Sequence, residues 1–157
     1  MIYLITDGSS YQDQLSGWAA FIVTGSGEKK LLYGGSNTGT VSRAELLPLL
    51  HGMSYIWNKV VNRRKGLPLT IISDSEYTVK VLSGLDSPSR NLDLWNAVNY
   101  LAGNFNIKCL WRKRNTHLYM KLVDGVAHGM RDEIKKIDCD HLKLLESVPS
   151  IDEAPFD

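Results

Sequence analysis

Four carboxylates stand at positions that together indicate a metal site, and they are Asp7, Glu45, Asp74 and Asp124. Asp7 and Asp74 each follow an apolar run that is typical of a buried strand. If these strands are neighbours in the same orientation, both side chains lie at one edge of a sheet. Carboxylates in contact repel one another unless cations bind between them. Oxygen ligands alone select hard ions, so we expect Mg²⁺ or Mn²⁺ and not zinc.

Three of these acids also have simple structural explanations. Ser42-x-x-Glu45 matches a capping box, in which the glutamate reaches back to the amide at the start of a helix. Asp74 precedes a predicted helix and could cap it. Asp124 could be a solvated residue on the surface of a helix. The combination favours the metal site, because capping and solvation do not require acids from distant segments to converge.

Hydrophobic periodicity predicts the elements that must bring the acids together. Strands are expected at residues 2–6, 17–23, 30–34, 68–73 and 106–111. Helices are expected from 42 to about 63, at 75–82, at 91–101 and at 118–135, with a further short helix at 141–147. Short turns join the first three strands, and helices separate the later ones. This order predicts an α/β fold, a mixed sheet flanked by helices.

Composition limits the class of protein. The chain has 157 residues, of which 43% are hydrophobic and 22% charged, with a net charge of +1. These values are typical of one soluble globular domain. No apolar run is long enough to span a bilayer, and the N-terminus lacks the pattern of a signal peptide. The two cysteines, Cys109 and Cys139, have no metal-binding spacing. We therefore expect a cytoplasmic protein, and a monomer.

Several motifs, in this order, resemble those of the type 1 ribonucleases H. They are Thr6-Asp7-Gly8-Ser9, Ser42-Arg43-Ala44-Glu45-Leu46 and Asp74-Ser75-x-Tyr77, with weaker matches at Asn91–Trp95 and in the strand ending at Trp111. The resemblance covers about residues 1–135. It implies a ribonuclease H-like fold, whose five-stranded mixed sheet has three antiparallel strands followed by two parallel ones.

The resemblance also implies a function. The protein would be an endonuclease that hydrolyses the RNA strand of RNA/DNA hybrids with two Mg²⁺ ions (or Mn²⁺), leaving 5′-phosphate products. The catalytic, metal-binding residues would be Asp7, Glu45, Asp74 and Asp124, and the residues contacting the hybrid duplex would be Gly8, Ser9, Ser42 and Arg43. The family's loop histidine, which assists proton transfer or product release, has two candidates here. His117 lies in the corresponding loop, and His128 lies one helical turn beyond Asp124.

Two other functions remain open from the sequence. One is another nuclease on the same fold, such as a Holliday-junction resolvase, although Glu45 on the first helix argues against it. The other is a non-catalytic nucleic-acid-binding or assembly domain. Contacts to nucleic acid would come from two basic clusters, 63–65 and 112–114.

The chain is expected to divide into a catalytic domain, 1–137, and a C-terminal segment, 138–157, with a short helix and an acidic tail. The tail contains acids followed by Pro155-Phe156. This pattern resembles the tail by which bacterial single-stranded DNA-binding proteins recruit partners. The tail is therefore either a frayed acidic end or a docking peptide for a protein partner.

Overall fold

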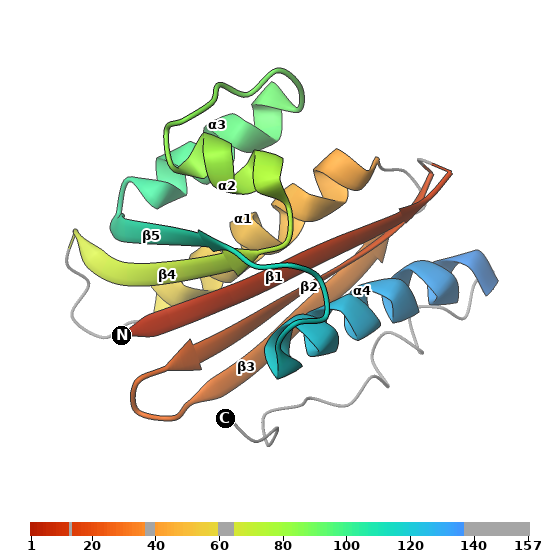
Figure 1. Ribbon diagram of the computed structural model, residues 1–157, viewed down its shortest axis with the longest axis horizontal. Helices are drawn as coiled ribbons and strands as arrows, with labels where there is room; N and C mark the ends of the chain where they lie inside the picture. The colour runs from red at the N-terminus through yellow and green to blue at the C-terminus, as the bar shows by residue number, and fades with distance from the viewer. Residues whose placement is uncertain (13, 37–39, 60–64, 137–157) are drawn as a thin grey trace.

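The sheet and its helices were obtained as a computed structural model, which describes residues 1–12, 14–36, 40–59 and 65–136. Figure 1 shows the elements in chain order. They are β1 (Ile2–Tyr11), β2 (Leu15–Thr24), β3 (Lys29–Ser36), α1 (Val41–Lys59), β4 (Leu67–Ser73), α2 (Glu76–Leu82), α3 (Leu92–Ala102), β5 (Phe105–Trp111) and α4 (Leu118–Lys136). The predicted order is confirmed. The helix predicted at 141–147 lies outside the described residues.

The five strands form one mixed sheet in the order β3-β2-β1-β4-β5. β1 pairs antiparallel with β2, and β2 pairs antiparallel with β3. β1 and β4 are parallel, as are β4 and β5. This topology confirms the predicted fold class, and it places β1, which contains Asp7, beside β4, which ends just before Asp74.

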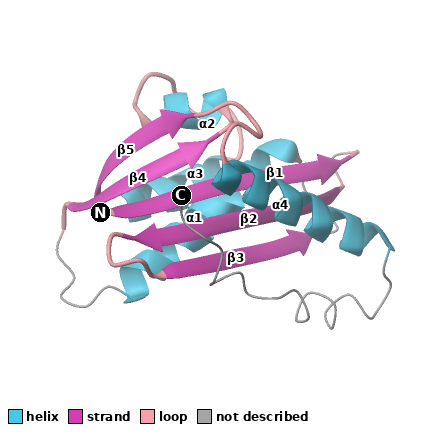
Figure 2. Cartoon of the chain, turned by 60° about the horizontal axis from the view of Figure 1, so that its bottom comes forward, coloured by secondary structure: helices cyan, strands magenta, loops and turns pink. Residues whose placement is uncertain are grey.

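Helices cover both faces of the sheet (Figure 2). α1, α2 and α3 lie on one face, and α4 lies on the other over β1, β2 and β3. Because side chains alternate along a strand, Leu4 packs among the residues of α1 while Ile5 packs against Val123 of α4. Trp95 of α3 is buried in the core between this helix and the sheet, as its helical spacing predicts. No described helix combines the length and the apolar content that crossing a bilayer requires.

β1 is longer than its apolar run. The prediction ended this strand at residue 6 and placed Asp7 just beyond it, but Asp7 lies within β1 and pairs with Ala19 of β2. Pairing with β2 continues as far as Tyr11 opposite Leu15. The backbone hydrogen bonds of this hairpin maintain the strand through polar residues such as Thr6 and Ser9, both of them buried.

Candidate metal centre

Strand register brings Asp7 and Asp74 to the same level of the sheet. Ile5 of β1 pairs with Ile72 of β4, and each aspartate lies two residues further along its own chain. Since alternate residues share a face, both carboxylates start from the same side of the sheet. Asp7 is 1% exposed, and the Asp74 side chain is 9% exposed.

Glycine at position 8 allows α1 to bring Glu45 against β1. A Cβ atom on Gly8 would lie 2.3 Å from the carbonyl carbon of Ala44 and 2.6 Å from the amide nitrogen of Glu45. Any larger residue would therefore push the first turn of α1 away from the strand. The resemblance implied that Gly8 contacts substrate, and the structure gives it this packing role.

The capping explanation for Glu45 is wrong. α1 begins at Val41, and its first turn is capped by Thr40, whose side-chain oxygen accepts a hydrogen bond from the Arg43 amide at 3.3 Å. Glu45 is buried and faces the two aspartates. The capping role suggested for Asp74 is also wrong, because Ser75 caps α2 by accepting from the Thr78 amide.

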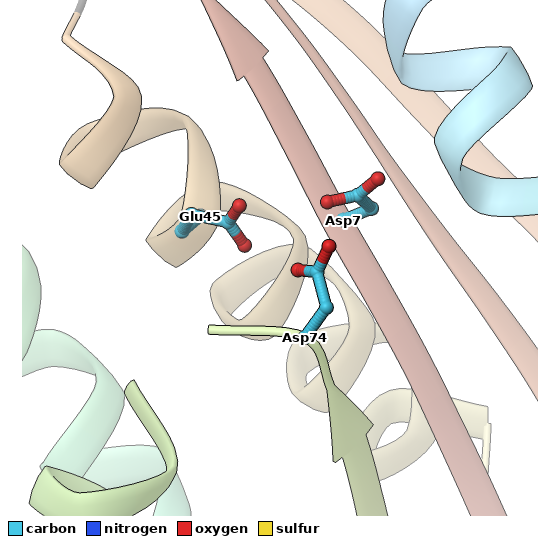
Figure 3. A group of neighbouring side chains, drawn as sticks. All are labelled: Asp7, Glu45 and Asp74. Carbon is cyan, nitrogen blue, oxygen red and sulfur yellow. The ribbon is translucent and has the colours of Figure 1, made fainter. Parts of the chain in front are cut away.

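Asp7, Glu45 and Asp74 form a compact carboxylate triad. One oxygen from each side chain lies within 4.8 Å of the others. Figure 3 shows the three carboxylates pointing toward one another from β1, α1 and the end of β4. Three segments that are distant in the sequence thus place acids around one small volume.

Asp124, on α4, lies next to this triad but outside it. Its carboxylate interacts with Asp7, and its Oδ1 atom lies 3.3 Å from Nε2 of His128 and 3.7 Å from Nε of Arg114. Arg114 also donates a hydrogen bond from Nε to Asp74 at 3.1 Å. The sequence placed Arg114 among the residues that contact substrate. In the structure its guanidinium bridges two of the acids, Asp74 and Asp124.

Burial and mutual repulsion perturb the protonation of the triad. The pKa of Asp7 rises from its ordinary value of 3.8 to about 8. Desolvation is the largest cause, followed by the charge of Asp74 and the interaction with Asp124, and the Gly8 amide opposes them. Burial first, and then the charges of Asp7 and Asp74, raise the pKa of Glu45 well above its usual range. The charge of Arg114 only partly offsets this.

The chemistry of these ligands fits a hard divalent cation. The Oε2 atom of Glu45 is buried and has no hydrogen-bond partner among the described residues. An unpartnered carboxylate oxygen is costly in a protein interior, and a bound cation would remove that cost. The candidate donors are all carboxylate oxygens, which suit Mg²⁺, Ca²⁺ or Mn²⁺. Asp7, Glu45 and Asp74 would hold such an ion.

The two candidate histidines have different surroundings. His117 lies at the start of α4, where its Nδ1 atom accepts a hydrogen bond from the Tyr119 amide at 3.2 Å, so it serves as the cap of the helix. His128 contacts Asp124 through Nε2, and its Nδ1 atom lies 3.4 Å from the Ser9 hydroxyl. The structure therefore places His128 among the acids and His117 at a helix end.

Of the residues expected to contact substrate, Ser42 lies beside the triad and two others already have protein partners. Ser42 lines a depression of about 270 Å³ together with Glu45 and Asp74. Arg43 forms an ion pair with Asp93 at 3.3 Å. Ser9 accepts a hydrogen bond from Arg131 at 3.0 Å, a contact that the sequence analysis missed. The spacing of 124, 128 and 131 on one helix face could have indicated it.

Curated proteins similar to this chain are named ribonucleases H. No family model matches the chain. A protein of Pseudomonas savastanoi pv. phaseolicola named "Ribonuclease H" is 26% identical over 151 residues, which cover 87% of this chain and 96% of that protein. A "Ribonuclease H" of Neisseria gonorrhoeae is 29% identical over 145 residues, covering 81% of this chain and 92% of the relative.

Solved structures have the same fold. The N-terminal RNase H domain of the Mycobacterium tuberculosis protein rv2228c superimposes with a TM-score of 0.73 at 20% identity, over 86% of this chain and 96% of that one. LC11-RNase H1, solved in complex with an RNA/DNA hybrid, gives a TM-score of 0.72 at 14% identity, over 87% of this chain and all of that one. The fold of the described residues is therefore ribonuclease H-like. Within that class the resemblance to the type 1 ribonucleases H is confirmed, and the curated relatives are enzymes.

Proposed function

We propose that this protein is a metal-dependent endonuclease that hydrolyses the RNA strand of RNA/DNA hybrids. The observation that carries the proposal is the carboxylate triad, in which acids from β1, α1 and β4 lie within 4.8 Å of one another. A buried cluster of this kind destabilises a metal-free protein. Its presence in a chain with ribonuclease H relatives supports a catalytic role over a purely structural one.

Asp7, Glu45 and Asp74 would hold one divalent ion, and Asp7, Asp74 and Asp124 would contribute to a second. Two bound Mg²⁺ or Mn²⁺ ions would supply activation of water and stabilisation of the 3′-oxygen leaving group. The chain's own part is to hold ionised carboxylates in a fixed arrangement despite their raised pKa values. β1 and β4 hold Asp7 and Asp74 in fixed positions, because each of these strands is hydrogen-bonded to a neighbouring strand on both sides.

We also propose that His128 is a positioning residue for Asp124. Arg131 donates a hydrogen bond to the Ser9 oxygen, which leaves the Ser9 hydroxyl hydrogen available for Nδ1 of His128. The ring would then carry its hydrogen on Nε2, which lies 3.3 Å from Oδ1 of Asp124. A small reorientation of the ring would let it donate a hydrogen bond to this oxygen, which otherwise has no hydrogen-bond partner among the described residues. This arrangement would orient Asp124 toward Asp7. In metalloproteins, residues that do not bind the metal commonly orient its ligands through hydrogen bonds in this way.

The test is a cleavage assay on four labelled substrates, namely an RNA/DNA hybrid, duplex DNA, duplex RNA and a four-way junction, each with Mg²⁺ or with EDTA. We expect cleavage of the RNA strand of the hybrid alone, and only with Mg²⁺. Asp7→Asn and Asp74→Asn should abolish it. Asp86→Asn, a change of the same chemistry in an exposed loop, should have no effect.

Stability separates loss of chemistry from loss of fold. Since each Asn variant removes a repelling carboxylate, the metal-free variants should be at least as stable as the parent in urea unfolding. Cutting of the four-way junction in preference to the hybrid would instead indicate a resolvase. Cleavage that survives both Asn substitutions would show that the triad is not the catalytic centre.

A further inference from the structure

A second feature of the surface lies away from the acids. A depression of about 780 Å³ opens between the β2–β3 hairpin and the last turns of α1. Its wall includes Ile2, five residues before Asp7 on β1, which corresponds to about 16 Å along a strand. It also includes Tyr55, ten residues after Glu45 on α1, about 15 Å along a helix. The depression is therefore separate from the carboxylate triad.

The lining of this depression combines positive charge with an apolar surface. It contains three lysines, Lys29, Lys30 and Lys59, against one acid, Glu28. The ammonium groups of Lys30 and Lys59 each lie 5.9 Å from the centre of the Tyr55 ring. Isoleucines from β1, β2 and α1 complete the wall. A surface of this composition suits a peptide that carries both carboxylates and an apolar side chain.

We propose that this depression binds the acidic C-terminal segment of the same chain, residues 150–157. The segment, SIDEAPFD, contains three acids and no basic residue, with Ile151 and Phe156 as apolar side chains. Its carboxylates complement the lysines, and Phe156 complements the Tyr55 and isoleucine surface. This inference rests on charge and composition at a site separate from the acids, so it does not depend on the proposed nuclease activity.

The chain is long enough for this contact. α4 approaches β2 near Gly17, where the backbone of Ala127 and Arg131 lies close, and so runs toward the start of that strand. The depression is lined by Thr24 at the opposite end of β2 and by residues of α1, so it lies on the other face of the sheet from α4. The path covers about 30 Å along the strand and passes around the edge strand β3. Asp152 is the sixteenth residue after Lys136, the last residue of α4. Extended, they span about 50 Å.

Because the segment belongs to the same chain, a weak intrinsic affinity would be sufficient to keep it bound. A flexibly linked segment has an effective concentration on the order of 1 mM at its binding site. A dissociation constant on the order of 100 μM for the free peptide would then leave most molecules with the segment bound. Lysine–carboxylate pairs at a partly exposed surface, together with one buried aromatic ring, are compatible with that affinity.

Another depression is a weaker candidate for the same segment. It has a volume of about 500 Å³, lies at the start of α4 and is lined mainly by apolar residues, including Tyr3, Ile72 and Met120. Among the described residues that line it, Arg112 is the one lysine or arginine. Three acids find less complementary charge here than beside three lysines. The two depressions therefore give the experiment a direct comparison.

The experiment uses a variant lacking residues 149–157 and a fluorescein-labelled peptide of residues 149–157. We expect the peptide to bind the deletion variant, and to bind the full chain at least tenfold more weakly because the chain's own segment competes. In the deletion variant, Lys59→Glu and Lys30→Glu should each weaken peptide binding about tenfold. A Phe156→Ala peptide should also bind more weakly.

Matched changes elsewhere provide the controls. Lys80→Glu, on the exposed surface of α2, and Arg112→Glu, in the other depression, should leave peptide affinity within twofold. Thermal unfolding of each variant confirms that it is folded. The proposal is overturned if the peptide does not bind, if Arg112→Glu rather than the lysine variants weakens binding, or if the full chain and the deletion variant bind it equally. A full chain that sediments as a dimer while the deletion variant is a monomer would also overturn it, because the segment would then bind a second copy.

Discussion

At the scale of single residues, the protonation of Asp7 links the stability of the protein to metal binding. Its pKa of about 8 in the folded protein contrasts with about 3.9 in an unfolded chain. Between these two values the folded state holds a proton that the unfolded state has lost. The contribution of this group to stability is therefore complete below about pH 4 and is lost as the pH rises through about 8.

We expect the metal-free protein to lose stability as the pH rises from 5 to 8, by up to about 1.4 kcal/mol per pH unit for one proton. Urea unfolding in EDTA at several pH values measures this slope. Asp7→Asn should flatten it, and Mg²⁺ should restore stability at pH 8 because the ion binds the ionised acids. A slope that is the same in the parent and in Asp7→Asn would mean that Asp7 ionises normally.

The two histidines near α4 should respond oppositely to substitution. His117→Ala removes a helix cap and should cost about 1 kcal/mol of stability, with cleavage rate within threefold of the parent. His128→Ala should leave stability nearly unchanged but lower kcat, or Mg²⁺ affinity measured by calorimetry, by about 10- to 100-fold. His128→Gln, which keeps a donor, should recover part of the loss. Reversed effects of the two alanine variants would assign the functional role to His117.

At the scale of elements, close approach of helices to the sheet places the acids. Gly8 allows the first turn of α1, with Glu45, to contact β1. Gly17 has the same function on the other face, because a Cβ atom there would lie 2.1 Å from the Ala127 carbonyl oxygen of α4. α4 also carries Asp124. Glycines in the strands therefore set how closely the helices on both faces approach the sheet. This approach in turn sets the positions of Glu45 and Asp124.

Substitution of Gly8 should test this dependence. Gly8→Ala places a methyl group against the backbone of α1. This backbone cannot shift aside as the flexible end of a side chain can. We expect a loss of roughly 3 kcal/mol or more in unfolding free energy, and weaker Mg²⁺ binding because Glu45 is displaced. The matched control is Gly129→Ala in α4, where a Cβ atom meets nothing within 4 Å. That change should stabilise the helix by up to about 1 kcal/mol. Equal stability of the two variants would contradict the packing role of Gly8.

At the scale of the whole molecule, low net charge limits the attraction to nucleic acid. The net charge is +1, and two arginines near the acids are paired within the protein, Arg43 with Asp93 and Arg114 with Asp74. Within the described part of the chain, these two pairs reduce the positive charge near the acids that could neutralise phosphates. We expect modest affinity for the hybrid and a shallow plot of log affinity against log salt, with a slope of about −4 or less in magnitude. A slope near −10, measured by fluorescence anisotropy, would show that many more phosphates are contacted.

The C-terminal segment should be dispensable for cleavage. The boundary expected after residue 137 remains a prediction, because 137–157 lie outside the described residues. All four candidate acids precede it. Deletion of 149–157 should therefore leave the cleavage rate of a short hybrid within a few-fold of the parent. A folded deletion variant without activity would show that the segment contributes to the site.

The amino-acid sequence alone determined the order of the elements and singled out four acids as candidate metal ligands. Both depend on local patterns, since alternation of apolar residues reflects strand pairing and a period of 3.6 reflects helical hydrogen bonding. The parallel arrangement of β1 and β4 was implied by the resemblance to the type 1 ribonucleases H. The convergence of Asp7 and Asp74 could therefore be predicted before any coordinate was known.

Only the tertiary structure decided which partners these residues have. Ser9 and His128 are 119 residues apart, and Arg114 and Asp74 are 40 apart, so no local pattern records their contacts. The extension of β1 through Asp7 likewise depends on pairing with β2, and the choice of Thr40 over Ser42 as the cap depends on where α1 meets the strand. Local propensities differ by less than the packing energies that select these arrangements, and packing becomes defined only when the helices and the sheet meet.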